Sequence, residues 1–139
     1  METKSIEQLE KDKWEEPSEF PTDLVEKCFQ YRKINIGELN NEQLRLLISQ
    51  NIGLDYLIGI ALEKLEQDIC AEGDFYKGDL LESVSKVSTE FWSKKPIEYQ
   101  TLKQLIKLNS EKIKSELGDK HFDKIKERIQ VTVEPNNLS

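Results

Sequence analysis

The stretch LDYLIGIALEKLEQDI at residues 54–69 has apolar side chains that recur every three or four positions. An α-helix has about 3.6 residues per turn, so this spacing places them on one helix face. Ile60 widens that face, which indicates a helix at the centre of the fold. Gly59 lies within the helix, and we expect its missing side chain to let a neighbouring helix approach closely. The recurring apolar residues are Leu54, Leu57, Ile58, Ala61, Leu62, Leu65 and Ile69.

Helix-capping residues mark where several further helices begin and end. Ser5 and Asn40 are each followed three residues later by Gln, the capping-box arrangement that satisfies N–H groups at a helix start. Pro96 suits the first turn of a helix, where its missing N–H would have no partner, and Gly118 suits a helix end. Two further helices are expected to start at Thr22 or Asp23 and at Asp79, the latter running to Phe91 and Trp92, and a final amphipathic helix carries Phe122, Ile125 and Ile129.

The pattern along the whole chain predicts helices and no sheet, since no segment has a strong strand pattern. A length of 139 residues suits one domain with its own core. We therefore predict an all-α protein with a single compact domain of roughly seven helices over residues 1–133. Residues 134–139 are polar and are expected to form a frayed tail.

The sequence has no pattern typical of export or membrane insertion. No long apolar run without charges is present, so no membrane span is expected. The opening residues METKSIEQLEKDKW contain acids and no apolar signal-peptide segment, so we expect a cytoplasmic protein. Cys28 and Cys70 are the only cysteines, and we expect both to be buried, reduced thiols.

The negative charge of the chain is unevenly distributed. The net charge is -7, and residues 55–82 contain eight acidic residues against two basic ones. Nucleic-acid binding depends on neutralising phosphates, so an acidic surface of this kind disfavours it. An acidic region instead suits a basic protein partner, which it would attract over a distance.

Residue types that usually carry catalysis are scarce and poorly placed. The one histidine, His121, has no Cys or His four residues away, so a metal site on its helix is not indicated. Nucleotide-binding, nucleophile-elbow and zinc-protease motifs are absent, and we predict no catalytic residue, metal or cofactor. A calcium loop starting at Glu72 would need Gly where Lys77 stands. A hydrolase that uses two carboxylates, such as Glu72 and Asp79, remains open.

The segment AEGDFYKGDLL at residues 71–81 combines two glycines, an aromatic pair and acidic residues. One interpretation is a turn between helices, in which the glycines allow unusual backbone angles, Asp79 caps the next helix and Phe75 packs inward. The other is a protein-binding surface, because a loop held between helices can present aromatic and charged side chains to a partner. The two are compatible, and the candidate contact residues are Glu72, Asp74, Phe75, Tyr76 and Asp79.

Three stretches together resemble the immunity proteins of bacterial contact-dependent growth inhibition (CDI) systems. They are KSIEQLEKDKW at 4–14, LRLLISQNIGLDYLIGIALEKL at 44–65 and AEGDFYKGDLLESV at 71–84. The resemblance covers roughly the first ninety residues, and the combination of QNIGL with EGDFYKGDLL is its most specific part. It implies a cytoplasmic, non-enzymatic protein that binds one cognate toxin, the C-terminal domain of a large surface-exposed effector.

The resemblance also implies how the loop at 71–81 would be used. The toxin is expected to be a nuclease, and an RNase rather than a DNase. The immunity protein would cover its active site or block substrate access. A nuclease cleft is basic because it attracts a polyanion. We therefore expect Glu72, Asp74 and Asp79 to meet basic toxin residues, with Tyr76 and Phe75 as anchors. The free protein is expected to be a monomer and the complex a heterodimer, without nucleic acid or membrane. A helical adaptor or assembly subunit, which would form a self-complementary dimer, remains the alternative.

Overall fold

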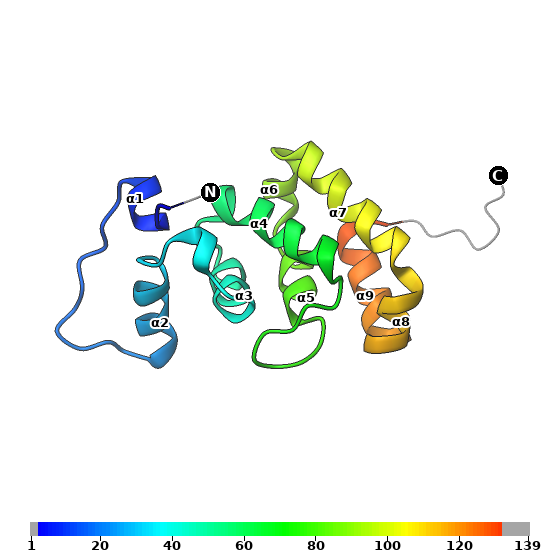
Figure 1. The fold of residues 1–139 in the computed structure, drawn as a ribbon, viewed down its shortest axis with the longest axis horizontal. Coiled ribbons are helices and arrows are strands. Elements are labelled where there is room, and N and C mark those ends of the chain that lie inside the picture. Colours follow the sequence, from blue (N-terminus) through cyan, green and yellow to red (C-terminus); the bar gives the residue numbers. More distant parts are fainter. Residues whose placement is uncertain (1–2, 132–139) are drawn as a thin grey trace.

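The computed structural model describes residues 3–131 and is all-α within them, with nine α-helices and one short 3-10 helix (Figure 1). This confirms the predicted fold class and the single compact domain. The end of the predicted domain at residue 133 and the tail predicted for 134–139 lie outside the described residues. The helices are α1 (Ile6–Glu10), α2 (Asp23–Tyr31), η1 (Ile36–Glu38), α3 (Asn41–Ser49), α4 (Leu54–Gln67), α5 (Asp79–Ser85), α6 (Thr89–Ser93), α7 (Pro96–Leu108), α8 (Ser110–Leu117) and α9 (Asp119–Ile129).

The helix starts predicted at Ser5 and Asn40 are confirmed, and one break between helices was missed. Ser5 and Asn40 each form a capping box with the Gln three residues later. The single helix predicted from Asp79 to Trp92 is wrong, because α5 ends at Ser85 and α6 begins after Ser88. The hydroxyl of Ser88 accepts the N–H of Phe91 at 3.2 Å, so Ser88 starts a new helix.

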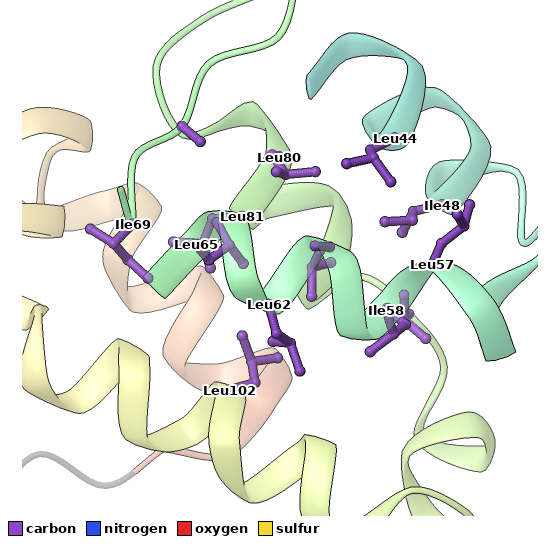
Figure 2. Packing of buried hydrophobic residues seen from close by; sticks show 14 of the residues in the cluster. Leu44, Ile48, Leu57, Ile58, Leu62, Leu65, Ile69, Leu80, Leu81 and Leu102 are labelled. Atoms are coloured by element: carbon purple, nitrogen blue, oxygen red, sulfur yellow. The ribbon is translucent and has the colours of Figure 1, made fainter. Parts of the chain in front are cut away.

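Helix α4 lies at the centre of the core, as its apolar pattern predicted. Its buried residues lie between α3 and α5 on one side and α7 on the other, and Figure 2 shows Leu62 beside Leu102 of α7. Each such leucine side chain contributes about 1.5–3 kcal/mol when fully buried. The residues labelled in Figure 2 are Leu44, Ile48, Leu57, Ile58, Leu62, Leu65, Ile69, Leu80, Leu81 and Leu102.

The expectation for Gly59 is wrong. A Cβ atom added at Gly59 would meet no heavy atom within 4 Å, so no neighbouring helix uses the space. The position is exposed on the outer face of α4. Among residues 3–131, no helix is both long enough and apolar enough to cross a bilayer.

A buried arginine attaches the N-terminal segment to α2. Arg32 is 2% exposed, and its guanidinium donates to a carboxylate oxygen of Glu10 at 2.9 Å and to the carbonyl oxygen of Asp12 at 2.7 Å. The guanidinium also lies 4.0 Å from the centre of the Trp14 ring. Figure 1 shows residues 11–22 as an arc that joins α1 to α2. Trp14 in this arc packs against Phe29 of α2, with the two ring centres 5.1 Å apart.

Candidate functional site

The loop that connects α4 to α5 is folded around the carboxylate of Asp79. Asp79 is the first residue of α5 and is only 2% exposed. One of its oxygens accepts the N–H of Gly73 at 2.6 Å, and the other accepts the N–H groups of Phe75 at 3.0 Å and Tyr76 at 3.4 Å. The prediction that Asp79 caps α5 is therefore wrong: the N-cap is Gly78, and the Asp79 side chain instead holds the preceding loop.

Helix α3 supports the same loop from a second side. A carboxylate oxygen of Glu42 accepts the N–H of Asp74 at 2.9 Å, and the side-chain amide of Asn41 donates to the carbonyl of Glu72 at 3.2 Å. Glu42 also pairs with Arg45, whose Nε lies 2.7 Å from Glu42 Oε1. This hydrogen bond lowers the pKa of Glu42, so the carboxylate stays charged and continues to accept the loop N–H.

The two glycines of the loop allow it to lie close to its supports. Gly78 has φ +85°, in the left-handed region that favours glycine, and an added Cβ would lie 2.8 Å from a methyl carbon of Leu117. A Cβ added at Gly73 would lie 2.6 Å from Oε1 of Glu42 and 3.2 Å from its Cα. The loop therefore packs against α3 and α8 at positions where a side chain would not fit.

The opposite side of the loop faces solvent. Phe75 is 66% exposed and Tyr76 is 39% exposed, and Glu72 and Asp74 are also exposed. The expectation that Phe75 packs inward is wrong. The Arg45 guanidinium lies 4.3 Å from the centre of the Phe75 ring and supports the exposed ring from behind.

The rim of this surface is formed by Tyr76 together with α5 and α9. The Tyr76 hydroxyl donates to a carboxylate oxygen of Glu82, and its ring centre lies 6.0 Å from that of His121. Burial and the hydrogen bond to Glu82 raise the pKa of Tyr76 to about 12. Burial also raises the pKa of Glu82, but the Tyr76 hydrogen bond and nearby cations, among them Arg128 at 3.6 Å, outweigh it and leave a lowered pKa. Tyr76 is thus held in place while part of its ring remains accessible.

The structure brings four of the five predicted contact residues to one surface. Glu72, Asp74, Phe75 and Tyr76 are exposed together, whereas Asp79 lies beneath them. Sequence reasoning missed the supporting residues Glu42, Arg45, Glu82 and His121. Only the three-residue spacing of Glu42 and Arg45 carried a signal, and it indicated an ion pair within one helix rather than a support for a distant loop.

The chemistry available at this site is recognition by charge and aromatic contact. Within residues 3–131, no group of three or more His, Cys, Asp and Glu side chains is placed to hold a metal ion. Both oxygens of Asp79 accept backbone N–H groups, so Asp79 lies buried beneath the loop rather than exposed beside Glu72. The exposed side chains on this loop are the carboxylates of Glu72 and Asp74, the rings of Phe75 and Tyr76, and Lys77, which pairs with Glu116 of α8 at 2.9 Å.

Comparison with known proteins identifies the family. No curated protein and no solved structure matches the chain. The family model for CDI immunity proteins matches residues 8–104, which is more than half of the chain. The matched region runs from α1 into α7 and includes the whole loop between α4 and α5. The resemblance found in the sequence is thereby confirmed, and the chain belongs to the family of CDI immunity proteins.

Proposed function

We propose that this protein is a cytoplasmic immunity protein that binds the toxin domain of its cognate CDI effector and neutralises it without catalysing a reaction. Its family supports the general function. The observation that carries the proposal is the loop of residues 72–78, which presents Phe75 and Tyr76 beside the carboxylates of Glu72 and Asp74. We infer that this surface contacts the toxin.

Charge supports a basic partner for this surface. Within residues 3–131, neither Glu72 nor Asp74 takes part in a side-chain ion pair, so both carboxylates are available to a partner. A toxin that cleaves RNA would carry a basic substrate cleft, because its substrate is a polyanion. Opposite charges accelerate encounter, whereas the buried contacts formed afterwards determine how slowly the complex dissociates. Phe75 and Tyr76 would supply such contacts.

The rigidity of the loop supports tight binding. Ordering a flexible loop on association costs conformational entropy, and a loop already held in shape avoids much of that cost. The carboxylates of Asp79 and Glu42 hold the amides of residues 73–76 in the free protein. Inhibition then requires only that the bound protein covers the toxin active site or the path of its substrate.

The test uses the C-terminal domain of the cognate CDI effector, and measures binding kinetics at several salt concentrations. A double variant, Glu72→Gln with Asp74→Asn, should lower the association rate and weaken its dependence on salt. The matched control is Glu15→Gln with Glu19→Gln, which removes two exposed charges from the arc that precedes α2. Phe75→Ala should mainly raise the dissociation rate.

Three outcomes separate the parts of the proposal. Loss of affinity in the loop variants alone, together with loss of growth protection during co-expression of the toxin domain, supports both the function and the surface. Equal kinetics for the loop variants, the control and the wild type would place the contact elsewhere. A wild-type protein that neither binds the toxin domain nor protects cells would refute the function itself.

A further inference from the structure

A second open surface lies between α4 and α7. It is a groove of about 670 Å³, lined on the α4 side by Glu66, its one charged lining residue, and on the α7 side by apolar and uncharged polar residues: Pro96, Ile97, Gln100, Thr101, Gln104, Leu105 and Leu108. Figure 1 places α7 along the upper edge of the molecule and the loop between α4 and α5 at the lower edge. Glu66 lies one residue before the end of α4 at Gln67, after which the chain continues into that loop. The groove is therefore separate from the loop surface but connected to it by α4.

The groove is bordered by the two most exposed large apolar side chains in residues 3–131. Ile97 is 77% exposed and Leu108 is 72% exposed. Together with Thr101 and Leu105 they follow a spacing of three or four residues, which places them along one side of α7. Single exposed apolar residues are common on soluble proteins, but a row of them beside a groove is typical of an interaction surface.

The outer face of α4 offers room for a partner to approach. Gly59, Glu63 and Glu66 are spaced four and three residues apart, so they share one side of the helix. A glycine inside a helix destabilises it relative to alanine, and nothing within 4 Å of Gly59 requires the missing side chain in the free protein. A partner whose backbone lies close to α4 would require the absence of a side chain at this position.

Charge decides which partner fits. Within the described residues, neither Glu63 nor Glu66 takes part in an ion pair. A twofold contact between two copies of the chain through this groove would place the same surface on both sides of the contact. Since no basic residue lines the groove, such a contact would lack a counter-charge. A partner segment with apolar side chains flanked by Lys or Arg supplies both kinds of contact.

The size of the loop surface also calls for further contact area. A stable protein–protein interface usually involves about 20–30 residues on each side, far more than the five exposed loop residues Glu72, Asp74, Phe75, Tyr76 and Lys77. We propose that the groove between α4 and α7 is a second docking surface for the toxin, and that it binds an apolar toxin segment flanked by Lys or Arg. This inference rests on the proposed function.

The test measures binding of the same effector C-terminal domain to groove variants of the full chain. Gly59→Leu adds a bulky side chain where the free protein has space, and Ile97→Ser with Leu108→Ser removes the apolar border. Each should raise Kd at least about tenfold, mainly through a faster dissociation rate. The control is Leu24→Ser on α2, a side chain that is also partly exposed, at 42%. Thermal unfolding of each free variant should remain within a few degrees of the wild type, because the altered positions are exposed.

Each result bears on the groove in a defined way. Weaker binding by both groove variants, with unchanged binding by Leu24→Ser, supports the proposal. Wild-type affinity in both groove variants, while the loop variants lose affinity, would overturn the groove and leave the proposed function in place. No binding by the wild-type protein would overturn both. A free protein that sediments as a dimer, and becomes a monomer in the Ile97→Ser and Leu108→Ser variant, would show that a second copy fills the groove.

Discussion

Replacing Asp79 with Asn tests whether the buried carboxylate holds the loop that carries the proposed contact residues. The substitution keeps the size of the side chain but removes its charge and replaces one oxygen with an NH2 group. One carboxylate oxygen accepts Gly73 N–H at 2.6 Å, and the other accepts Phe75 N–H at 3.0 Å. Whichever oxygen is replaced, the amide NH2 would then face a backbone N–H group.

The expected loss of stability follows from these bonds. A hydrogen bond to a charged group contributes about 1.5–3 kcal/mol. Asp79→Asn removes one of the two short bonds and weakens the other, so we expect the free energy of unfolding to fall by about 3 kcal/mol. Asp79 is 2% exposed, so solvent screens these contacts little. At about 4 °C per kcal/mol for a chain of this size, Tm should fall by about 12 °C.

The assay is urea unfolding followed by far-ultraviolet circular dichroism, combined with hydrogen exchange at the loop amides. Gly73 and Phe75 should lose protection before the core helices do. Asp74→Asn is the control, since Asp74 is exposed, and should change stability by less than about 0.5 kcal/mol. A change of the same small size for Asp79→Asn, with protected loop amides, would refute the reasoning. If Asp79→Asn instead altered the salt dependence of toxin association as much as Asp74→Asn, Asp79 would be a direct contact.

Three further predictions concern single side chains. Gly59→Ala should raise the free energy of unfolding by about 0.5–1 kcal/mol in urea, because the added methyl group meets no neighbour, and a decrease would contradict an open helix face. The lowered pKa of Glu42 means that its contribution is complete above its unfolded pKa near 4.5 and disappears as pH falls through the folded value. The urea concentration at the unfolding midpoint should therefore fall as pH is lowered through that acidic range, and it should fall less steeply for Glu42→Gln than for the wild type. Parallel curves of midpoint against pH for the two proteins would argue against the Arg45 pairing. The difference in ultraviolet absorbance between the wild type and Tyr76→Phe, measured against pH, should show that the Tyr76 phenol ionises with a pKa of about 12. A midpoint near pH 10 would be inconsistent with the Glu82 contact.

The helices that the sequence located well are those whose signals are local. The capping boxes at Ser5 and Asn40 and the apolar spacing of α4 depend only on neighbours within a few residues. The break between α5 and α6 was missed because Val84, Val87 and Phe91 keep a helical spacing across it. Ser88 can cap a helix or lie on the surface of one, and the chain around it does not decide between the two.

The loop that forms the candidate site was predicted as a loop between helices, but the residues that support it were not. The glycines, aromatics and acids of residues 72–78 marked a loop between helices. That Glu42 accepts the N–H of Asp74 depends on how α3 packs against α5, across more than thirty residues of chain. Asp79 is an acid like its neighbours in sequence, and only the folded backbone shows that its oxygens point toward the loop amides rather than toward solvent.

The burial of Arg32 makes the first helix more important than its length suggests. The Arg32 guanidinium forms an ion pair with Glu10 and is covered by the Trp14 ring. A shortened chain that begins after residue 14 would leave a cation inside the protein without its anion, a change that typically costs about 3–5 kcal/mol. Shortened proteins made for crystallisation or for mapping the toxin complex should therefore keep α1, or replace Arg32 with methionine at the same time.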